Sequence, residues 1–300
     1  MAPPEITVVG SANLDLVVEV DRVPLVGETV LGGDLTRIPG GKGANQAVAA
    51  ARLGRRAAMI GRLGADEGGS ILRAALERND IDTTALMTTR DTPNGVAMIA
   101  VGNDGDNSIV VSPGANGRVT PADILTAGEL VSDAQIVLLQ LEIPMAAVEA
   151  AAAVATGTVL LNPAPAAALP PGLLEHVDIL VPNQTELAVL ADHDGPVDVE
   201  TATALARALP VENVIVTLGA AGAMVVTPDE SVHVPAPAVT PVDTTGAGDS
   251  FCAAVADGLV RSLSLVDAVT WAVQVGAATT LRPGAQPSLP TPTEVAQLLA

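Results

Sequence analysis

The chain has 300 residues, 49% hydrophobic and 16% charged, which suffices for a buried core in one large domain or two small ones. Its formal net charge of −20 argues against nucleic acid and anionic membranes as partners, because both need a basic surface. A single cysteine excludes an internal disulfide, the three histidines are too far apart for a zinc site, and no apolar run could span a membrane, so we expect a cytoplasmic protein.

The N-terminal segment leads into a first strand without a signal-peptide pattern, since Met1 to Glu5 carries no basic residue. This strand ends in Val9-Gly10-Ser11-Ala12-Asn13, which lacks the G-x-G-x-x-G spacing of dinucleotide-binding folds. Asn13 and Asp15 offer polar groups that suit the hydroxyls of a polyol. Considered alone, these two residues fit a simple Asx turn equally well.

Several segments near the N-terminus have strand character without intervening helix. They are Leu14 to Val20, Glu28 to Leu31, and a hairpin of Gly95 to Val101 and Ser108 to Ser112 across Gly102-Asn103-Asp104-Gly105. We expect a small separate sheet, built from segments at about 15–38 and 93–112, that projects as a lid over a crevice. Its exposed apolar face would close on a substrate or pair with a second subunit to give a homodimer. The alternative is an antiparallel edge of the main sheet.

A glycine cluster, Gly40-Gly41-Lys42-Gly43-Ala44-Asn45-Gln46, precedes a helical stretch from Ala47 to Leu53. Lys42 is the only lysine, against thirteen arginines, which makes it informative unless it is a surface lysine that survived by chance. The glycines would let a ligand approach the backbone, and Lys42 and Asn45 offer hydrogen bonds to hydroxyls. The cluster is not a Walker A loop, because Thr36 lacks the required glycine and Gly43 the required hydroxyl.

Apolar strand-like runs alternate with helical patterns through the middle of the chain, which predicts a mainly parallel sheet covered on both faces. The expected buried strands are Ile136 to Leu141, Thr158 to Leu161, Ile179 to Val181 and Val214 to Thr217. Polar residues mark their carboxyl ends, namely Glu142, Asn162, Asn183 and Thr217. Because ligands bind such sheets outside the carboxyl ends of the strands, these four residues predict a lined crevice.

The segment from Asp243 to Phe251 reads Asp-Thr-Thr-Gly-Ala-Gly-Asp-Ser-Phe and leads into an apolar helical stretch, Cys252 to Val260. Free N–H groups at a helix N-terminus attract an anion, and glycines let it come close. Asp249 would stand beside that anion as a candidate base, as phosphoryl transfer requires. Ordinary helix capping is the alternative for this segment taken alone. Because the chain is acidic, a polyphosphate would be bound locally, by N–H groups and metal cations.

Six motifs in the same order resemble the PfkB carbohydrate kinase family and, within it, the ribokinase group. They are Gly-Ser-Ala-Asn-Leu-Asp at 10–15, Gly-Gly-Lys-Gly-Ala-Asn-Gln at 40–46, Asn-Pro-Ala-Pro-Ala at 162–166, Pro-Asn-Gln-Thr-Glu at 182–186, Asp-Thr-Thr-Gly-Ala-Gly-Asp at 243–249 and Gly-Ala-Gln-Pro-Ser at 284–288. The resemblance implies one kinase domain over residues 1–300 with the ribokinase-like three-layer α/β/α fold, a mainly parallel central sheet and a small β-sheet lid. It also implies transfer of the γ-phosphate of ATP to the 5-hydroxyl of D-ribose.

Carried over residue by residue, the resemblance implies that Asp249 is the general base and that the backbone of Gly246, Ala247 and Gly248 forms the anion hole. The positions that hold the sugar hydroxyls correspond to Asn13, Asp15, Gly41, Lys42, Asn45, Glu142 and Asp249. Those around the nucleotide correspond to Asn183, Thr217, Gly219, Gly222 and Gly248, with Val273 where many relatives place Asn or His beside adenine.

The resemblance also implies two metal ions. Glu186, in Asn183-Gln184-Thr185-Glu186, matches a glutamate that organises Mg²⁺ through water. A potassium site is implied at Asp243, Thr245, Thr279, Arg282, Gly284 and Ser288, where carbonyls and two side chains would hold the ion behind the anion hole. The stretch from Thr279 to Pro283 is an unusual version of this cation loop.

Two classes of alternative remain open. A sibling kinase could act on 2-deoxyribose or fructose, because one hydroxyl contact separates these sugars from ribose. Nucleosides rank lower, since the chain has only Phe251 and Trp271 for stacking a base. A sugar-binding regulator on the same fold would have a damaged base or anion hole, and both motifs are intact.

Overall fold

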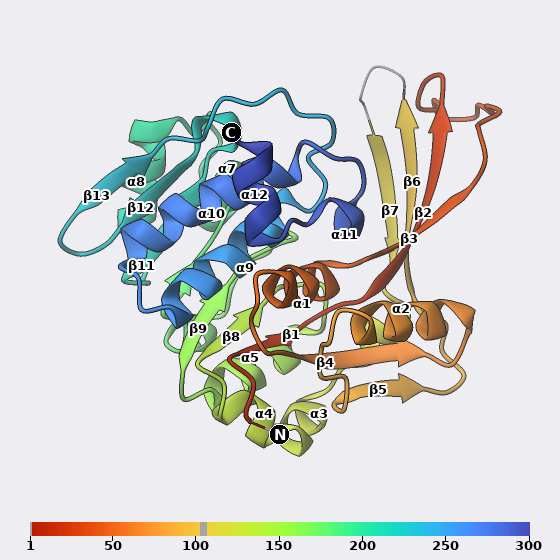
Figure 1. The fold of residues 1–300 in the computed structure, drawn as a ribbon, viewed down its shortest axis with the longest axis horizontal. Helices are drawn as coiled ribbons and strands as arrows, with labels where there is room; N and C mark the ends of the chain where they lie inside the picture. Colours follow the sequence, from red (N-terminus) through yellow and green to blue (C-terminus); the bar gives the residue numbers. More distant parts are fainter. Residues whose placement is uncertain (1, 103–106) are drawn as a thin grey trace.

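Two sheets organise the part of the chain that the computed structural model describes, residues 2–102 and 107–300 (Figure 1). The larger sheet has nine strands in the order β13-β12-β11-β10-β9-β8-β1-β4-β5. Neighbouring strands pair in parallel along the run β11-β10-β9-β8-β1-β4-β5. β12 and β13 extend this sheet as an antiparallel edge. Their bounds are β1 Ile6–Val9, β4 Ala57–Gly64, β5 Leu86–Thr89, β8 Ile136–Leu139, β9 Thr158–Leu161, β10 Ile179–Leu180, β11 Asn213–Thr217, β12 Ala223–Val226 and β13 Ser231–Val234.

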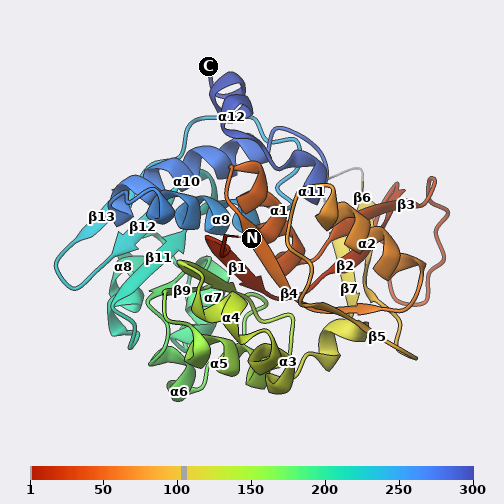
Figure 2. The same ribbon diagram turned by 60° about the horizontal axis from the view of Figure 1, so that its bottom comes forward.

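Helices cover both faces of this sheet (Figure 2). One face carries α1 Lys42–Arg52, α2 Glu67–Glu77, α9 Ala247–Val260, α10 Leu265–Thr279 and α12 Pro292–Leu298. The other face carries α3 Pro121–Thr126, α4 Gly128–Ser132, α5 Met145–Val154, α6 Pro171–Leu174, α7 Gln184–Leu190 and α8 Val199–Ala208. Short turns of helix complete the chain at η1 Gly114–Arg118, η2 Gly219–Ala221 and α11 Ala285–Ser288.

The alternation of side chains along each strand explains the two layers of core. In β8, Ile136 and Leu138 pack into the core under α1, α9 and α10, while Val137 and Leu139 pack into the core on the other face. All four residues are buried, because a parallel strand between two helix layers has no solvent face. The prediction of a three-layer fold with a mainly parallel sheet is confirmed.

A smaller sheet, in the order β3-β2-β6-β7, projects beside the layered body (Figure 1). Its strands are β2 Asn13–Val20, β3 Thr36–Gly40, β6 Gly95–Gly102 and β7 Asn107–Ser112. The predicted hairpin pairs as expected, with Met98 opposite Val110, although residues 103–106 of its turn lie outside the described residues. β2 and β6 pair in parallel, so this sheet is separate from the main one and mixed rather than an antiparallel edge of it.

The predicted strand at Glu28 to Leu31 is wrong. The segment folds back locally, since Glu28 donates its N–H to the carbonyl of Leu25 and its carboxylate pairs with Arg22. Gly27 has a φ of 83°, which an extended strand does not allow. The strand that pairs with β2 is instead β3, where Thr36 lies opposite Val17 and Gly40 opposite Asn13.

Two functional helices begin earlier than the sequence pattern predicts. α1 starts at Lys42 rather than Ala47, so the end of the glycine cluster forms its first turn. The N–H of Ala44 donates to the carbonyl of Ser11 at 2.8 Å, which docks this turn on the segment after β1. α9 starts at Ala247 rather than Cys252, after Gly246 in the left-handed conformation. In the described ranges, no helix is long and apolar enough to cross a membrane.

Candidate active site

The start of α9 places a carboxylate at a helix N-terminus. Asp249 lies in the first turn and is only 7% exposed. The N–H of Ala247 donates to the carbonyl of Thr244 at 3.2 Å, whereas within the described residues the N–H groups of Gly246 and Gly248 donate to no backbone carbonyl. The last two groups are therefore available to an anion, while Ala247 would have to exchange its partner.

A cavity of about 240 Å³ opens in front of this turn, outside the carboxyl ends of the strands. Three of the four predicted polar strand ends line it, namely Asn162, Asn183 and Thr217. The fourth, Glu142, accepts a hydrogen bond from the N–H of Lys42 at 3.2 Å and so lies beside the cavity. The remaining lining residues are Lys42, Ala164, Val181, Glu186, Thr244, Gly246, Gly248, Asp249 and Cys252.

Asp249 is held by amide groups from α1. Asn45 donates its side-chain N–H to Oδ2 of Asp249 at 2.9 Å, and Gln46 donates to Oδ1 at 3.3 Å. Burial raises the pKa of Asp249 above its usual range; Lys42 and the two amides oppose the increase, and Glu142 adds to it. A carboxylate with a raised pKa takes up a proton more readily, which suits a general base.

Lys42 supplies the positive charge of the site. Burial works against its ammonium, but the carboxylates of Asp249, Glu142 and Glu186 outweigh that cost and raise the pKa of Lys42 above its ordinary value. The side chain therefore stays charged at neutral pH. It faces carboxylates from three separate segments of the chain, which the sequence pattern around the lysine does not indicate.

A second group of polar residues lies next to Asp249, where β2 begins. Its members are Ser11, Asn13, Asp15 and Glu142. Ser11 donates its hydroxyl to Glu142 at 2.5 Å, and the amide of Asn13 donates to the same oxygen at 3.5 Å. Burial first, then the charges of Glu142 and Asp249, raise the pKa of Asp15 to about 7. Near neutral pH the carboxyl of Asp15 can therefore donate a hydrogen bond as well as accept one.

Close backbone packing supports this second group. Gly41 has a φ of 88°, and a Cβ there would lie 2.6 Å from the N atom of Asn13. The amide of Asn116 donates to Oδ1 of Asn13 at 2.7 Å and fixes that side chain. Sequence analysis missed Ser11 and Asn116 as parts of the site, although Ser11 stands inside a quoted motif; no local signal marks Asn116.

The predicted nucleotide positions are only partly brought together. Asn183 caps α7 and donates its backbone and side-chain N–H groups to the carboxylate of Glu186, each at 2.8 Å. Both residues line the cavity in this fixed arrangement. Gly219, Gly222 and Val273 do not line the cavity. Val273 is buried in the core from α10, and Gly222 has a φ of 94° that lets the chain turn from β11 to β12.

The predicted cation residues come from two segments that lie together. The N–H of Gly284 donates to Oδ2 of Asp243 at 2.7 Å, and Ser250 and Thr279 share a hydroxyl hydrogen bond of 2.8 Å. Burial opposes ionisation of Asp243, but the hydrogen bonds from Thr245 and Gly284 outweigh it and lower its pKa. The guanidinium of Arg282 points elsewhere, because it donates to the carbonyl of Ser288 and pairs with Glu294.

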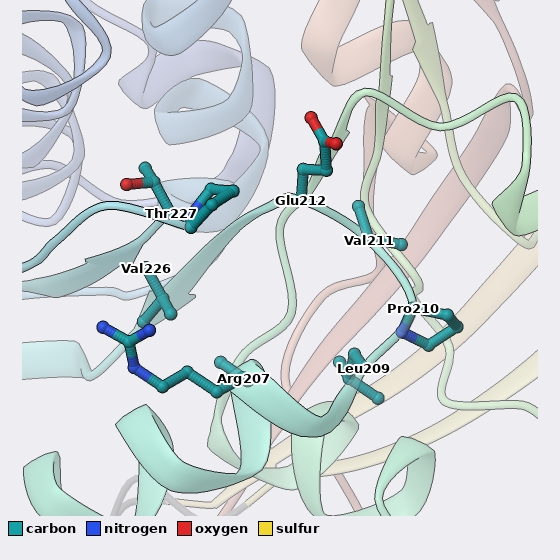
Figure 3. A pocket seen from close by; sticks show the side chains of 9 residues that line it. Arg207, Leu209, Pro210, Val211, Glu212, Val226 and Thr227 are labelled. Carbon is teal, nitrogen blue, oxygen red and sulfur yellow. The ribbon is translucent and has the colours of Figure 1, made fainter.

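A larger cavity, of about 320 Å³, lies at the opposite ends of the strands, where α8 leads into β11 (Figure 3). Its charged lining residues are Arg207 and Glu212, and the carboxylate of Glu212 points away from Arg207. None of the predicted site residues lines it. The chemistry of the chain therefore gathers at the smaller cavity.

Comparison with known proteins agrees with this arrangement. Residues 3–292 match the family model described as pfkB family carbohydrate kinase. The chain belongs to the pfkB family of carbohydrate kinases. It is 39% identical to the ribokinase of Bacillus subtilis (strain 168) over 298 residues, which cover 98% of this chain and 99% of the relative.

Two further proteins of known activity are similar to the chain over nearly its whole length. The solved structure of Arabidopsis thaliana ribokinase complexed with ribose and ATP matches with a TM-score of 0.89 at 35% identity, covering 100% of this chain and 99% of that chain. A deoxyribokinase of Salmonella typhi is 38% identical over 295 residues, covering 96% of each protein. The recognition of a PfkB kinase from six motifs is confirmed, and with it an ATP-dependent sugar kinase.

Proposed function

We propose that the chain is a ribokinase, which transfers the γ-phosphate of ATP to the 5-hydroxyl of D-ribose and releases D-ribose 5-phosphate and ADP. One observation carries the proposal: the buried carboxylate of Asp249, at the start of α9, lines the cavity and also interacts with Asn45 and with Asp15 of the neighbouring polar group. ATP would occupy the cavity, and the sugar would bind to Asn13, Asp15, Glu142 and Asn45.

In this mechanism Asp249 takes the proton of the 5-hydroxyl as its oxygen attacks the γ-phosphorus and the bond to ADP breaks. The N–H groups at the start of α9 and the ammonium of Lys42 face the charge that grows on the transferred group. Asn45 suits the sugar, because its side-chain oxygen is buried and accepts no hydrogen bond within the described residues. A sugar hydroxyl would satisfy that oxygen.

Two metal ions fit the residues present. The carboxylate of Glu186 faces the cavity, and Mg²⁺ bound there with ATP would neutralise charge on the phosphates. Asp243, Ser288 and the carbonyls of Thr245, Thr279, Arg282 and Gly284 would supply an all-oxygen donor set, and Asp243 stays ionised at neutral pH because its pKa is lowered. Such a set suits a hard cation, and we propose potassium.

A 2-deoxyribose kinase is the second candidate. The similarity to the Salmonella typhi deoxyribokinase, at 38% identity, is nearly as high as that to the Bacillus subtilis ribokinase, at 39%. Only the contacts to one hydroxyl distinguish the two sugars, and a site built to bond a hydroxyl rejects the analogue that lacks it. Asp15, Glu142 and the neighbouring Asn13 are the residues that would discriminate ribose from 2-deoxyribose.

Formation of ADP tests the proposal. We expect ribose-dependent ADP formation with Mg²⁺ and ATP, with a higher kcat/KM for ribose than for 2-deoxyribose, fructose or adenosine, and faster in potassium than in sodium. 5-Deoxyribose, which lacks the reacting hydroxyl, is the matched control and should give no turnover. A preference for 2-deoxyribose would reassign the acceptor, whereas binding of sugar without turnover of any acceptor would favour a sugar-binding regulator.

We also propose that the small sheet closes over the sugar and joins two subunits into a homodimer. Leu16, Met98 and Val110 lie in one row across β2, β6 and β7, on the face opposite Asp15. Met98 is 48% and Val110 57% exposed, which is typical of an apolar face that another surface covers.

Val110→Glu should therefore convert the dimer into a monomer, because two buried carboxylates in a symmetric interface would lack partners. Light scattering after size-exclusion chromatography measures the mass directly. Leu125→Glu is the control: Leu125 is 66% exposed on α3, away from the small sheet, and its replacement should leave the mass unchanged. A wild-type monomer would contradict the proposal.

A further inference from the structure

A chain of two glutamines connects Asp249 to the core of the main sheet. Gln46, in the second turn of α1, donates its side-chain N–H to Oδ1 of Asp249 at 3.3 Å. Gln140, directly after β8, donates its own N–H to the side-chain oxygen of Gln46 at 2.5 Å. Both glutamines have 0% of their surface exposed. Neither belongs to the groups that face the sugar or the nucleotide in the proposed mechanism.

The direction of these hydrogen bonds matters for the carboxylate. An amide side chain has an oxygen that accepts and an NH₂ group that donates. Because Gln140 occupies the oxygen of Gln46, the NH₂ group of Gln46 is turned toward Asp249. The reversed amide would place its oxygen against the carboxylate, which is repulsive. Gln140 therefore selects the orientation that stabilises an ionised Asp249.

Among the described residues, the side-chain hydrogen bonds of these two amides go only to each other and to Asp249. The side-chain oxygen of Gln140 is buried and accepts no hydrogen bond within the described residues. A Cβ on Gly10 would collide with that oxygen, so glycine at this position leaves room for the amide. Three segments that are distant in the sequence, around Gly10, Gln46 and Gln140, thus meet behind the carboxylate.

We propose that Gln46 is a positioning residue for Asp249, and that Gln140 acts through Gln46 by fixing the direction of its amide. Asn45, which faces the sugar in the proposed mechanism, donates to the other carboxylate oxygen of Asp249 at 2.9 Å. The two neighbouring residues therefore have different roles. Asn45 couples the base to the acceptor, and Gln46 couples it to the rigid sheet. This inference rests on the proposed function, since it assigns the role of Gln46 relative to the base of that reaction.

The charged groups around Asp249 determine how loss of the hydrogen bond from Gln46 would change the pKa of Asp249. Lys42 from α1, Glu142 after β8, Asp15 from β2, Glu186 from α7 and Cys252 on its own helix all interact with it electrostatically. Lys42 is the only cation among them. Because the Gln46 N–H stabilises the ionised form, removing it would raise the pKa of Asp249 further.

Gln46→Met tests the proposal, since methionine keeps the length of the side chain but cannot donate. We expect the acid limb of the pH profile of kcat/KM to move up by about one pH unit, because a hydrogen bond to a charged group has that magnitude. The rate should approach the wild-type value at high pH, and the KM of the sugar should change little. Gln140→Met should also move the acid limb to higher pH, but by a smaller amount.

The double variant gives the sharpest outcome. If Gln140 acts through Gln46, then Gln140→Met adds nothing in the Gln46→Met background. Thr7→Val is the matched control, because it removes a buried hydrogen bond of 2.5 Å to Leu130 from β1 and should lower only the melting temperature. An equal loss of rate at every pH, or additive effects of the two glutamine changes, would overturn the proposal. Should Gln46→Met fail to fold, Gln140→Met, which leaves Gln46 in place, decides by the same shift.

A readout without turnover separates this inference from the proposed function. The carboxyl carbon of Asp249 can be titrated by NMR in ¹³C-aspartate protein, with Asp249→Asn identifying the signal. If wild type phosphorylated no sugar, the proposed function would fail, yet an upward shift of this pKa in Gln46→Met would still support the role of Gln46. An unchanged pKa would overturn it.

Discussion

Asp249→Asn is expected to lower turnover by about a hundred- to ten-thousand-fold, the usual contribution of a general base. Asparagine has nearly the same shape and can still accept from Asn45 or Gln46, but it cannot take the proton of the hydroxyl. The KM for ATP should change little, because in the proposed mechanism Asp249 acts on the acceptor hydroxyl and is one of several residues that line the cavity. Steady-state kinetics and calorimetric titration with ATP measure the two effects separately.

Asp249→Asn should not lose stability, although it loses turnover. The pKa of Asp249 is raised in the folded protein, so above the ordinary pKa of aspartate this group destabilises the fold as it is forced to ionise. Asparagine removes that cost, and the melting temperature at neutral pH should stay the same or rise.

Asp257→Asn is the matched control for Asp249→Asn. Asp257 is buried on the same helix but pairs with Arg55 and Arg261. Its replacement should leave turnover near wild type, because Asp257 does not line the cavity. High activity of Asp249→Asn would contradict the assignment of the base.

Lys42→Met should lower kcat/KM by about a hundredfold or more, a magnitude typical of losing a group aimed at transition-state charge. It should also move the acid limb of the pH profile upward. Asp249 and Glu186 would lose the positive charge that opposes the rise of their pKa values, so both would bind a proton more tightly. Rate measurements over a range of pH, with sugar and ATP varied in turn, separate the two effects.

Lys42→Arg keeps the charge but not the compact ammonium, so it should raise the KM of the acceptor while changing the acid limb little. An unchanged acceptor KM in Lys42→Arg, together with a near wild-type rate in Lys42→Met, would make the single lysine incidental. Arg56→Met is a control for loss of a positive charge: Arg56 pairs with Glu5 at the far side of α1 and should affect neither quantity.

Much of the fold was predictable because the signals are local. Alternating strand-like and helical stretches between Ile136 and Thr217 predicted a parallel sheet, and each of these strands was found within two residues of its predicted end. Where a boundary depended on tertiary contacts the prediction failed. α1 begins at Lys42 because Ala44 bonds to Ser11. The strand predicted at Glu28 fails for a local reason, since Glu28 bonds to Leu25 and pairs with Arg22.

The site was predictable to the extent that its motifs are short. Asp249, Lys42 and the polar strand ends were named from the sequence, and the structure places Asn183, Glu186 and Thr217 around the same cavity. Gly219, Gly222 and Val273 lie outside its lining, and their roles in binding the nucleotide stay predictions. So do the two metal sites and a cytoplasmic location.

By itself, the sequence determined the class of fold, the kinase motifs and the presence of a carboxylate and two glycines at a helix start, because each is written in neighbouring residues. Only the tertiary structure decided which groups surround that carboxylate. Gln46 and Asp249 are 203 residues apart and Gln46 and Gln140 are 94 apart, so no local pattern joins them. The raised pKa values of Asp15 and Asp249 have the same origin, since burial and neighbouring charge exist only after distant segments pack together.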